Sequence, residues 1–231
     1  MSVHFDAGWC ATDLGDHRPC RLTYERYSYD SLPVLDGARF TGAFQWLGEP
    51  GEPLPERTAE LRRVSELLAA EGLALPADFV KFETASNLRG RLDEVSVTGC
   101  WSSLSEPLPS PVEPGAFLVR FFRDQQDCVL WCLYLRPSGE VFVVNSHLDY
   151  EAEYEARDED GWEPRSDLDD PVAQRAAILW CAPTFEQFAY RFWVENRLWY
   201  LTDDGPEQEL HLDAELRAYL DHYRADPAAA G

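Results

Sequence analysis

Two hydrophobic runs of strand length, joined by a short polar turn, constrain the fold of this chain most strongly. FLVRFF covers residues 117–122 and CVLWCLYL covers residues 128–135, with RDQQD between them. Both runs are rich in aromatic and β-branched residues, which favour strands. The second run is apolar on both faces, which predicts a central strand. A turn at residues 136–139 then leads to VFVVN, so the sequence predicts an antiparallel meander of three strands.

Helical patterns lie before and after this meander. Residues 56–71 place apolar side chains on one face and charged side chains on the other, which predicts an amphipathic helix. A second, short helix is expected to begin at Pro76. The segment CAPTFEQFAYRFWVENRLWYL predicts a longer helix from about Thr184. Only a narrow polar stripe interrupts its apolar surface, so neighbours should bury most of it. A last helix is expected over residues 213–223.

These elements together predict an α+β fold, with helices packed on a mostly antiparallel sheet. We expect this domain to cover residues 55–224. Residues 1–54 mix aromatic residues with Gly, Asp and Pro without a helical period. They are therefore expected to form an N-terminal extension with strand-like segments, which ends in the proline-rich linker EPGEPLPE. Residues 225–231 are expected to be a disordered tail.

The charge balance limits the class of partner. The chain has 20 Lys and Arg residues against 42 Asp and Glu residues, and its formal net charge is −22. Such a chain repels nucleic acid and anionic membranes, so a basic partner is favoured. No apolar run approaches the roughly twenty residues of a spanning helix. The start of the chain lacks a secretory signal pattern, and its six cysteines are scattered, so we expect a cytoplasmic, reduced protein.

A dense acidic segment is the candidate partner-binding site. Between Asp149 and Asp170 there are eleven acids and two arginines, a local charge of −11 + 2 = −9. Aromatic residues interleave with these acids and could serve as anchors for a basic protein. The competing interpretation is a solvated loop that only adds solubility. The candidate partner-binding residues are Asp149, Tyr150, Glu151, Glu153, Tyr154, Glu155, Asp158, Glu159, Asp160 and Trp162.

No pattern predicts a metal or cofactor site, and we expect no catalytic residues, metal or cofactor. A zinc set could be drawn from His4, Cys10, His17 and Cys20, but it lacks the short paired spacing of zinc knuckles. A cysteine nucleophile would need a nearby histidine, and Cys128 or Cys132 with His147 is the only pairing that neighbouring strands favour. Cysteines inside a hydrophobic strand are more often core residues.

Three segments resemble the SUKH superfamily, which includes bacterial toxin-immunity proteins and a eukaryotic cell-wall-assembly regulator. They are LALPADFVKFETAS, DQQDCVLWCLYLRPSGEVFVV and CAPTFEQFAYRFWVENRLWY, and the resemblance covers about residues 56–202. After the entry helix the chain reads ASNLRGRL, where SUKH-like chains usually have an Asn-Gly-Gly type of turn. The resemblance implies a SUKH-like single domain of the α+β class, without enzyme activity, that neutralises a toxin.

The functional expectation combines this resemblance with the charge. We expect a non-catalytic immunity protein, a monomer or weak dimer, that occludes the surface of a basic protein toxin, with a nuclease domain as the leading candidate. The alternative is a regulatory or scaffolding SUKH-like protein that binds a non-toxin cellular partner. A third hypothesis is a small hydrolase that uses a cysteine.

Overall fold

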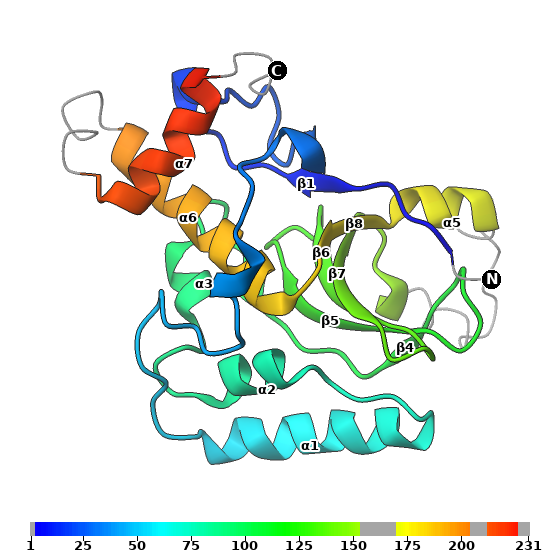
Figure 1. The fold of residues 1–231 in the computed structure, drawn as a ribbon. Coiled ribbons are helices and arrows are strands. Elements are labelled where there is room, and N and C mark those ends of the chain that lie inside the picture. Colours follow the sequence, from blue (N-terminus) through cyan, green and yellow to red (C-terminus); the bar gives the residue numbers. More distant parts are fainter. Residues whose placement is uncertain (1–2, 153–169, 204–211, 226–231) are drawn as a thin grey trace.

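The computed structural model describes residues 3–152, 170–203 and 212–225, and its centre is an antiparallel sheet (Figure 1). The order across this six-stranded sheet is β3-β5-β6-β7-β8, and β4 pairs with β5 beside β3. Each of these pairings is antiparallel. The predicted α+β class with a mostly antiparallel sheet is therefore confirmed. The strands are β3 (Trp101–Ser102), β4 (Leu108–Pro109), β5 (Phe117–Arg123), β6 (Leu130–Leu135), β7 (Val141–Ser146) and β8 (Leu179–Ala182).

The predicted meander forms the middle of the sheet. Phe117 of β5 lies opposite Leu135 of β6, and Leu130 of β6 lies opposite Ser146 of β7. All six residues of β6 are buried, as expected of a strand that is apolar on both faces. The sequence pattern did not predict β8, because LWCA is short and lies directly against the next helix.

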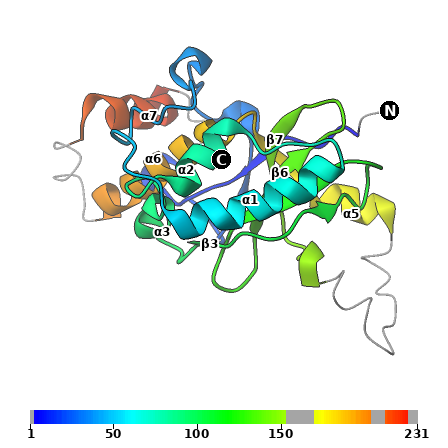
Figure 2. The same ribbon diagram turned by 90° about the horizontal axis from the view of Figure 1, so that it is seen from below.

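Helices cover one face of the sheet. They include α1 (Pro55–Ala70), α2 (Ala77–Thr84), α3 (Arg91–Val95) and α6 (Phe185–Asp203). Figure 2 shows α1 lying across the molecule in front of α2 and the sheet. The helix α6 begins where predicted, since the backbone N–H of Gln187 donates to Thr184 Oγ1 at 3.2 Å. Its rings pack edge-on against β5, with Phe192 5.0 Å from Phe122 between ring centroids.

The opposite face of the sheet has its own, smaller core. Tyr134 and Phe142 stack with their ring centroids 5.2 Å apart, and Phe5 packs edge-on against Tyr134 at 5.0 Å. Ile178 joins this cluster just after the helix α5 (Pro171–Ala177). The sheet is thus buried on both faces, which agrees with the continuous apolar pattern of β6.

The N-terminal segment belongs to the hydrophobic core. Its short strands β1 (Gly8–Cys10) and β2 (Arg26–Ser28) pair with each other, and Ala7 makes a parallel bridge to Trp180 of β8. Trp9 and Phe44 lie in the same buried cluster as α1, α2 and the sheet. The boundary predicted at residue 54 therefore does not coincide with a break in the core. The 3-10 turns of this segment are η1 (Gly15–His17), η2 (Tyr29–Ser31) and η3 (Gly37–Arg39).

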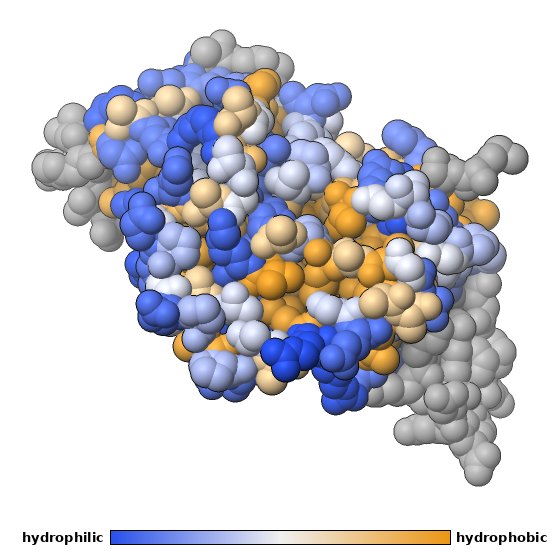
Figure 3. Space-filling view, turned by 60° about the horizontal axis from the view of Figure 1, so that its bottom comes forward, coloured by the Kyte–Doolittle hydropathy of each residue, from blue (hydrophilic) through white to orange (hydrophobic). Residues whose placement is uncertain are grey.

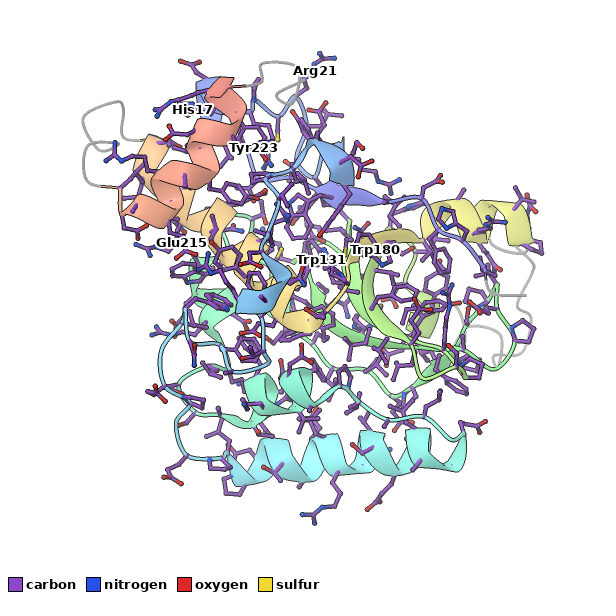
Figure 4. The ribbon with its side chains drawn as sticks, viewed as in Figure 1. His17, Arg21, Trp131, Trp180, Glu215 and Tyr223 are labelled. Atoms are coloured by element: carbon purple, nitrogen blue, oxygen red, sulfur yellow. The ribbon has the colours of Figure 1, made fainter. Side chains whose placement is uncertain are left out.

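A buried ion pair attaches the N-terminal segment to the C-terminal helices. Glu195 of α6 is fully buried, and both of its carboxylate oxygens accept hydrogen bonds from Arg18, at 2.8 and 2.7 Å. The Trp9 indole N–H and the Tyr219 hydroxyl also donate to Glu195, at 2.9 and 2.6 Å. Tyr219 belongs to α7 (Ala214–Ala225), the predicted last helix. Figure 4 shows the end of α7 with Tyr223 beside the segment that carries His17. A tail was expected at residues 225–231. Ala225 is the last residue of α7, and residues 226–231 lie outside the described residues.

Candidate functional site

The first residues of the predicted acidic segment hold a buried arginine. Arg120 projects from β5, and its guanidinium lies 3.3 Å from Asp149 Oδ1 and 2.5 Å from Glu151 Oε2. Asp149 also accepts backbone N–H groups of Glu151 and Ala152 at 3.1 and 3.4 Å, as an N-cap residue does. These two carboxylates therefore fix the start of the segment on the sheet.

The aromatic residue between them points inward. Tyr150 is only 6% exposed and lies in the smaller core, where its hydroxyl accepts a hydrogen bond from Ser146 at 3.3 Å. Its ring therefore packs within the protein. The other candidate partner-binding residues, Glu153, Tyr154, Glu155, Asp158, Glu159, Asp160 and Trp162, lie outside the described residues.

An exposed tryptophan adjoins this acidic site. Trp101 of the edge strand β3 is 46% exposed, and the Arg123 guanidinium lies over its ring at 5.7 Å from the centroid. Arg123 also pairs with Asp127 and lies 3.7 Å from Asp149. The structure thus places an aromatic side chain next to the start of the acidic segment. The sequence did not indicate Trp101, because its exposure depends on which neighbours the fold brings close to this edge strand.

Ion pairs within the chain neutralise much of its positive charge. Several arginines contact carboxylates within the chain, some deeply buried and others at the surface. A guanidinium paired with a carboxylate contributes little to the electric field around the protein. The carboxylates that outnumber the arginines therefore determine the sign of that field. The surface of the described chain is therefore predominantly acidic. These arginines are Arg18, Arg39, Arg57, Arg63, Arg91, Arg120, Arg123, Arg136 and Arg224.

A hydrophobic hollow opens on the side of α1 and α2 (Figure 3). It has a volume of about 390 Å³ and lies where the β6–β7 hairpin meets the first turns of α2 and α6. Leu133, Val141 and Phe185 contribute to its apolar lining, and Lys81 and Asp78 add charged groups. Asp78 accepts the backbone N–H of Glu186 at 3.0 Å, whereas Lys81, the only lysine of the chain, is exposed. Hollows of this kind can receive an apolar side chain of a partner.

The cysteines give no arrangement typical of an activated thiol. Burial raises the pKa of Cys132 to about 12, so this thiol remains protonated near neutral pH. His147 lies 3.4 Å from the Arg26 guanidinium. Burial, and then Arg26, lower the pKa of His147. Over the described ranges, the interactions of His147 do not include a cysteine. Among the six cysteines, Cys128 is the one with an exposed side chain.

The residues considered for zinc do not form a metal centre. Cys10 and Cys20 line one hollow of about 350 Å³. Burial raises their pKa values to about 12 and about 11, which opposes the thiolate form that zinc requires. In the part of the chain that the structure describes, no group of three or more His, Cys, Asp and Glu residues could hold a metal ion.

None of the described helices is both long enough and apolar enough to cross a membrane. The chain matches no family model, no curated protein and no solved structure.

Proposed function

We propose that this chain is a non-catalytic binding protein that neutralises a basic protein toxin by occluding its surface. The observation that carries the proposal is the pairing of arginines within the chain, which leaves a predominantly acidic surface on a chain of net charge −22. A toxin that acts on nucleic acid needs a basic surface to hold phosphates, so a nuclease domain is the proposed target. An acidic inhibitor gains attraction and fast encounter from this complementarity.

Two further features support the proposal. The resemblance of about residues 56–202 to the SUKH superfamily favours a toxin-immunity role, and the scattered cysteines favour a cytoplasmic location. The exposed Trp101 beside Asp149 offers an aromatic contact next to the acidic segment, and aromatic residues often dominate the energetics of protein interfaces. We propose that the acidic segment and Trp101 together form the toxin-binding surface.

The first experiment is capture of the partner from lysate of the native cell. The tagged full chain is loaded at low salt and eluted by rising salt, and mass spectrometry identifies what co-elutes. A stoichiometric basic protein that salt releases, and that is toxic when expressed alone, is the expected result. Recovery of a non-toxic partner would replace toxin neutralisation by the regulatory role.

A pair of charge-reversal variants then tests the surface. Glu153→Lys with Glu155→Lys changes two acidic-segment residues and leaves Glu151, which holds Arg120, intact. The control is Glu66→Lys with Glu71→Lys on the exposed side of α1 and its end. Both variants change the net charge by +4, from −22 to −18.

The two variants share a net charge, so they separate a local site from a general field. We expect the association rate constant, measured by stopped flow at low salt, to fall about tenfold for the acidic-segment variant and less than about twofold for the control. Equal effects of the two variants would show that no localised acidic site exists. A complex whose affinity does not change with salt would contradict the electrostatic mechanism itself.

A further inference from the structure

A groove lined by aromatic and arginine side chains lies along one side of α6. It forms between α3, the turn at residues 46–47 and the second half of α6, and it encloses about 380 Å³. Trp193, Arg197 and Tyr200 line it from α6, at positions that share one helix face. Trp46 and Arg91 line it from the other two elements. The volume is within the usual range of small-molecule sites.

Arg197 is the unusual member of this groove. Its guanidinium stacks on the Trp193 ring, 4.6 Å from the centroid. Within residues 3–152, 170–203 and 212–225, it has neither a carboxylate partner nor a hydrogen-bond acceptor. By contrast, Arg91 at the opposite wall pairs with Glu94 at 3.1 Å. The lining therefore holds two guanidinium groups and one carboxylate, a local excess of one positive charge on a strongly acidic protein.

The aromatic side chains determine how this positive charge is presented. Stacking on Trp193 fixes the plane of the Arg197 guanidinium and leaves its N–H edge free to donate two parallel hydrogen bonds. Trp46 lies 5.5 Å from Trp193 between ring centroids, and Tyr200 is 49% exposed. A planar ring could pack against these surfaces while an attached carboxylate reaches Arg197.

We propose that this groove binds a small aromatic carboxylate, with Arg197 as the anion-binding residue and Trp46, Trp193 and Tyr200 as the ring-binding residues. The inference is independent of toxin binding, because neither Trp101 nor the described start of the acidic segment, residues 149–152, is among the residues that line the groove. The proposed ligand of this groove is an anion, whereas the proposed toxin partner is basic.

The experiment uses two probes that differ in charge alone. N-acetyl-tryptophan carries a ring and a carboxylate, and N-acetyl-tryptophanamide carries the same ring without the charge. Each is titrated into the full chain to about 10 mM, and shifts of the protein's indole N–H signals are followed by NMR. We expect saturable shifts with the acid at Trp46 and Trp193, and binding of the amide weaker by about tenfold or more.

Matched variants assign the effect to the groove. Arg197→Gln removes the guanidinium charge that stacks on Trp193, and Arg62→Gln removes an exposed arginine of α1 that is not among the lining residues of the groove. We expect about tenfold weaker binding of the acid to the first variant and unchanged binding to the second, with both variants folded by circular dichroism. The proposal would be overturned if the acid and the amide bound equally well, or if Arg197→Gln bound the acid as tightly as the native protein does. It would also be overturned if the acid gave no saturable shifts.

Discussion

Replacing Glu195 by glutamine tests whether the buried ion pair anchors the N-terminal segment. Glutamine has nearly the same shape as glutamate but lacks the charge. In the native protein, Arg18, Trp9 and Tyr219 all direct donors at this carboxylate, and both members of the ion pair have completely buried side chains. The variant leaves the Arg18 guanidinium buried without a counter-charge.

The expected loss follows from this burial. Removing one partner of a buried ion pair costs about 3 to 5 kcal/mol, since the remaining charge keeps its desolvation penalty. For a domain of this size, each kcal/mol shifts the melting temperature by about 2 to 4 °C, so we expect a decrease of about 6 to 20 °C. A control is Glu94→Gln, because the Arg91–Glu94 pair is exposed and should contribute less than about 1 kcal/mol.

The assay is urea unfolding followed by circular dichroism. A decrease in the free energy of unfolding below about 1 kcal/mol for Glu195→Gln would refute the reasoning, as would an equal effect of the control. Arg18→Met with Glu195→Leu removes both charges, so this double variant should lose less stability than the sum of its single variants.

The same pair predicts a pH dependence. Burial disfavours the charge on Glu195, but Arg18 and the hydrogen bonds outweigh that effect and lower its pKa in the folded protein. A lowered folded-state pKa gives stability that is complete above the unfolded value of about 4.3 and is lost as pH falls through the folded value. The stability difference between the native protein and Glu195→Gln should therefore narrow below about pH 4.

Three smaller perturbations test local features. Under native conditions, iodoacetamide should alkylate the exposed Cys128 and leave the buried Cys181 unmodified, as peptide mass spectrometry would show; protection of Cys128 would contradict its placement. Thr184→Ala removes the side-chain cap of α6 and should cost about 1 kcal/mol in urea unfolding, and no loss would mean that the cap is dispensable. Gly90→Ala should cost about 1 to 2 kcal/mol, because Gly90 has a φ of +83°, whereas Gly37→Ala, where an added methyl group meets no neighbour and φ is not positive, should be nearly neutral.

The local patterns of the sequence predicted the centre of the fold well. The meander, α1, α2, α6 and α7 follow from apolar periodicity and capping residues, which act over a few positions along the chain. The N-terminal segment was harder to predict. Its strands have only three residues each, and its place depends on contacts such as Arg18 with Glu195, across 177 positions of sequence. Such contacts leave no periodic signal.

In the candidate site, too, the sequence predicted some features and missed those that depend on distant contacts. The sequence indicated the density of acids after Asp149 but not that Tyr150 turns into the core or that Arg120 holds Glu151. The exposure of Trp101, and the lack of a carboxylate partner for Arg197 among the described residues, likewise depend on which neighbours the fold brings close. Composition predicts the sign of the surface charge, and only the three-dimensional arrangement shows which side chains remain available to a partner.

The contact between Arg18 and Glu195 also determines when, during synthesis, the core around the N-terminal segment can pack. A ribosome adds about 5 to 20 residues per second, so the 177 positions between these two residues take about 9 to 35 seconds to translate. During that interval Trp9 and Arg18 lack the helices that bury them. The native packing of the segment that carries Trp9 and Arg18 therefore waits for α6 and α7, and a chain stopped before α6 would leave the aromatic residues of this segment open to chaperones and proteases.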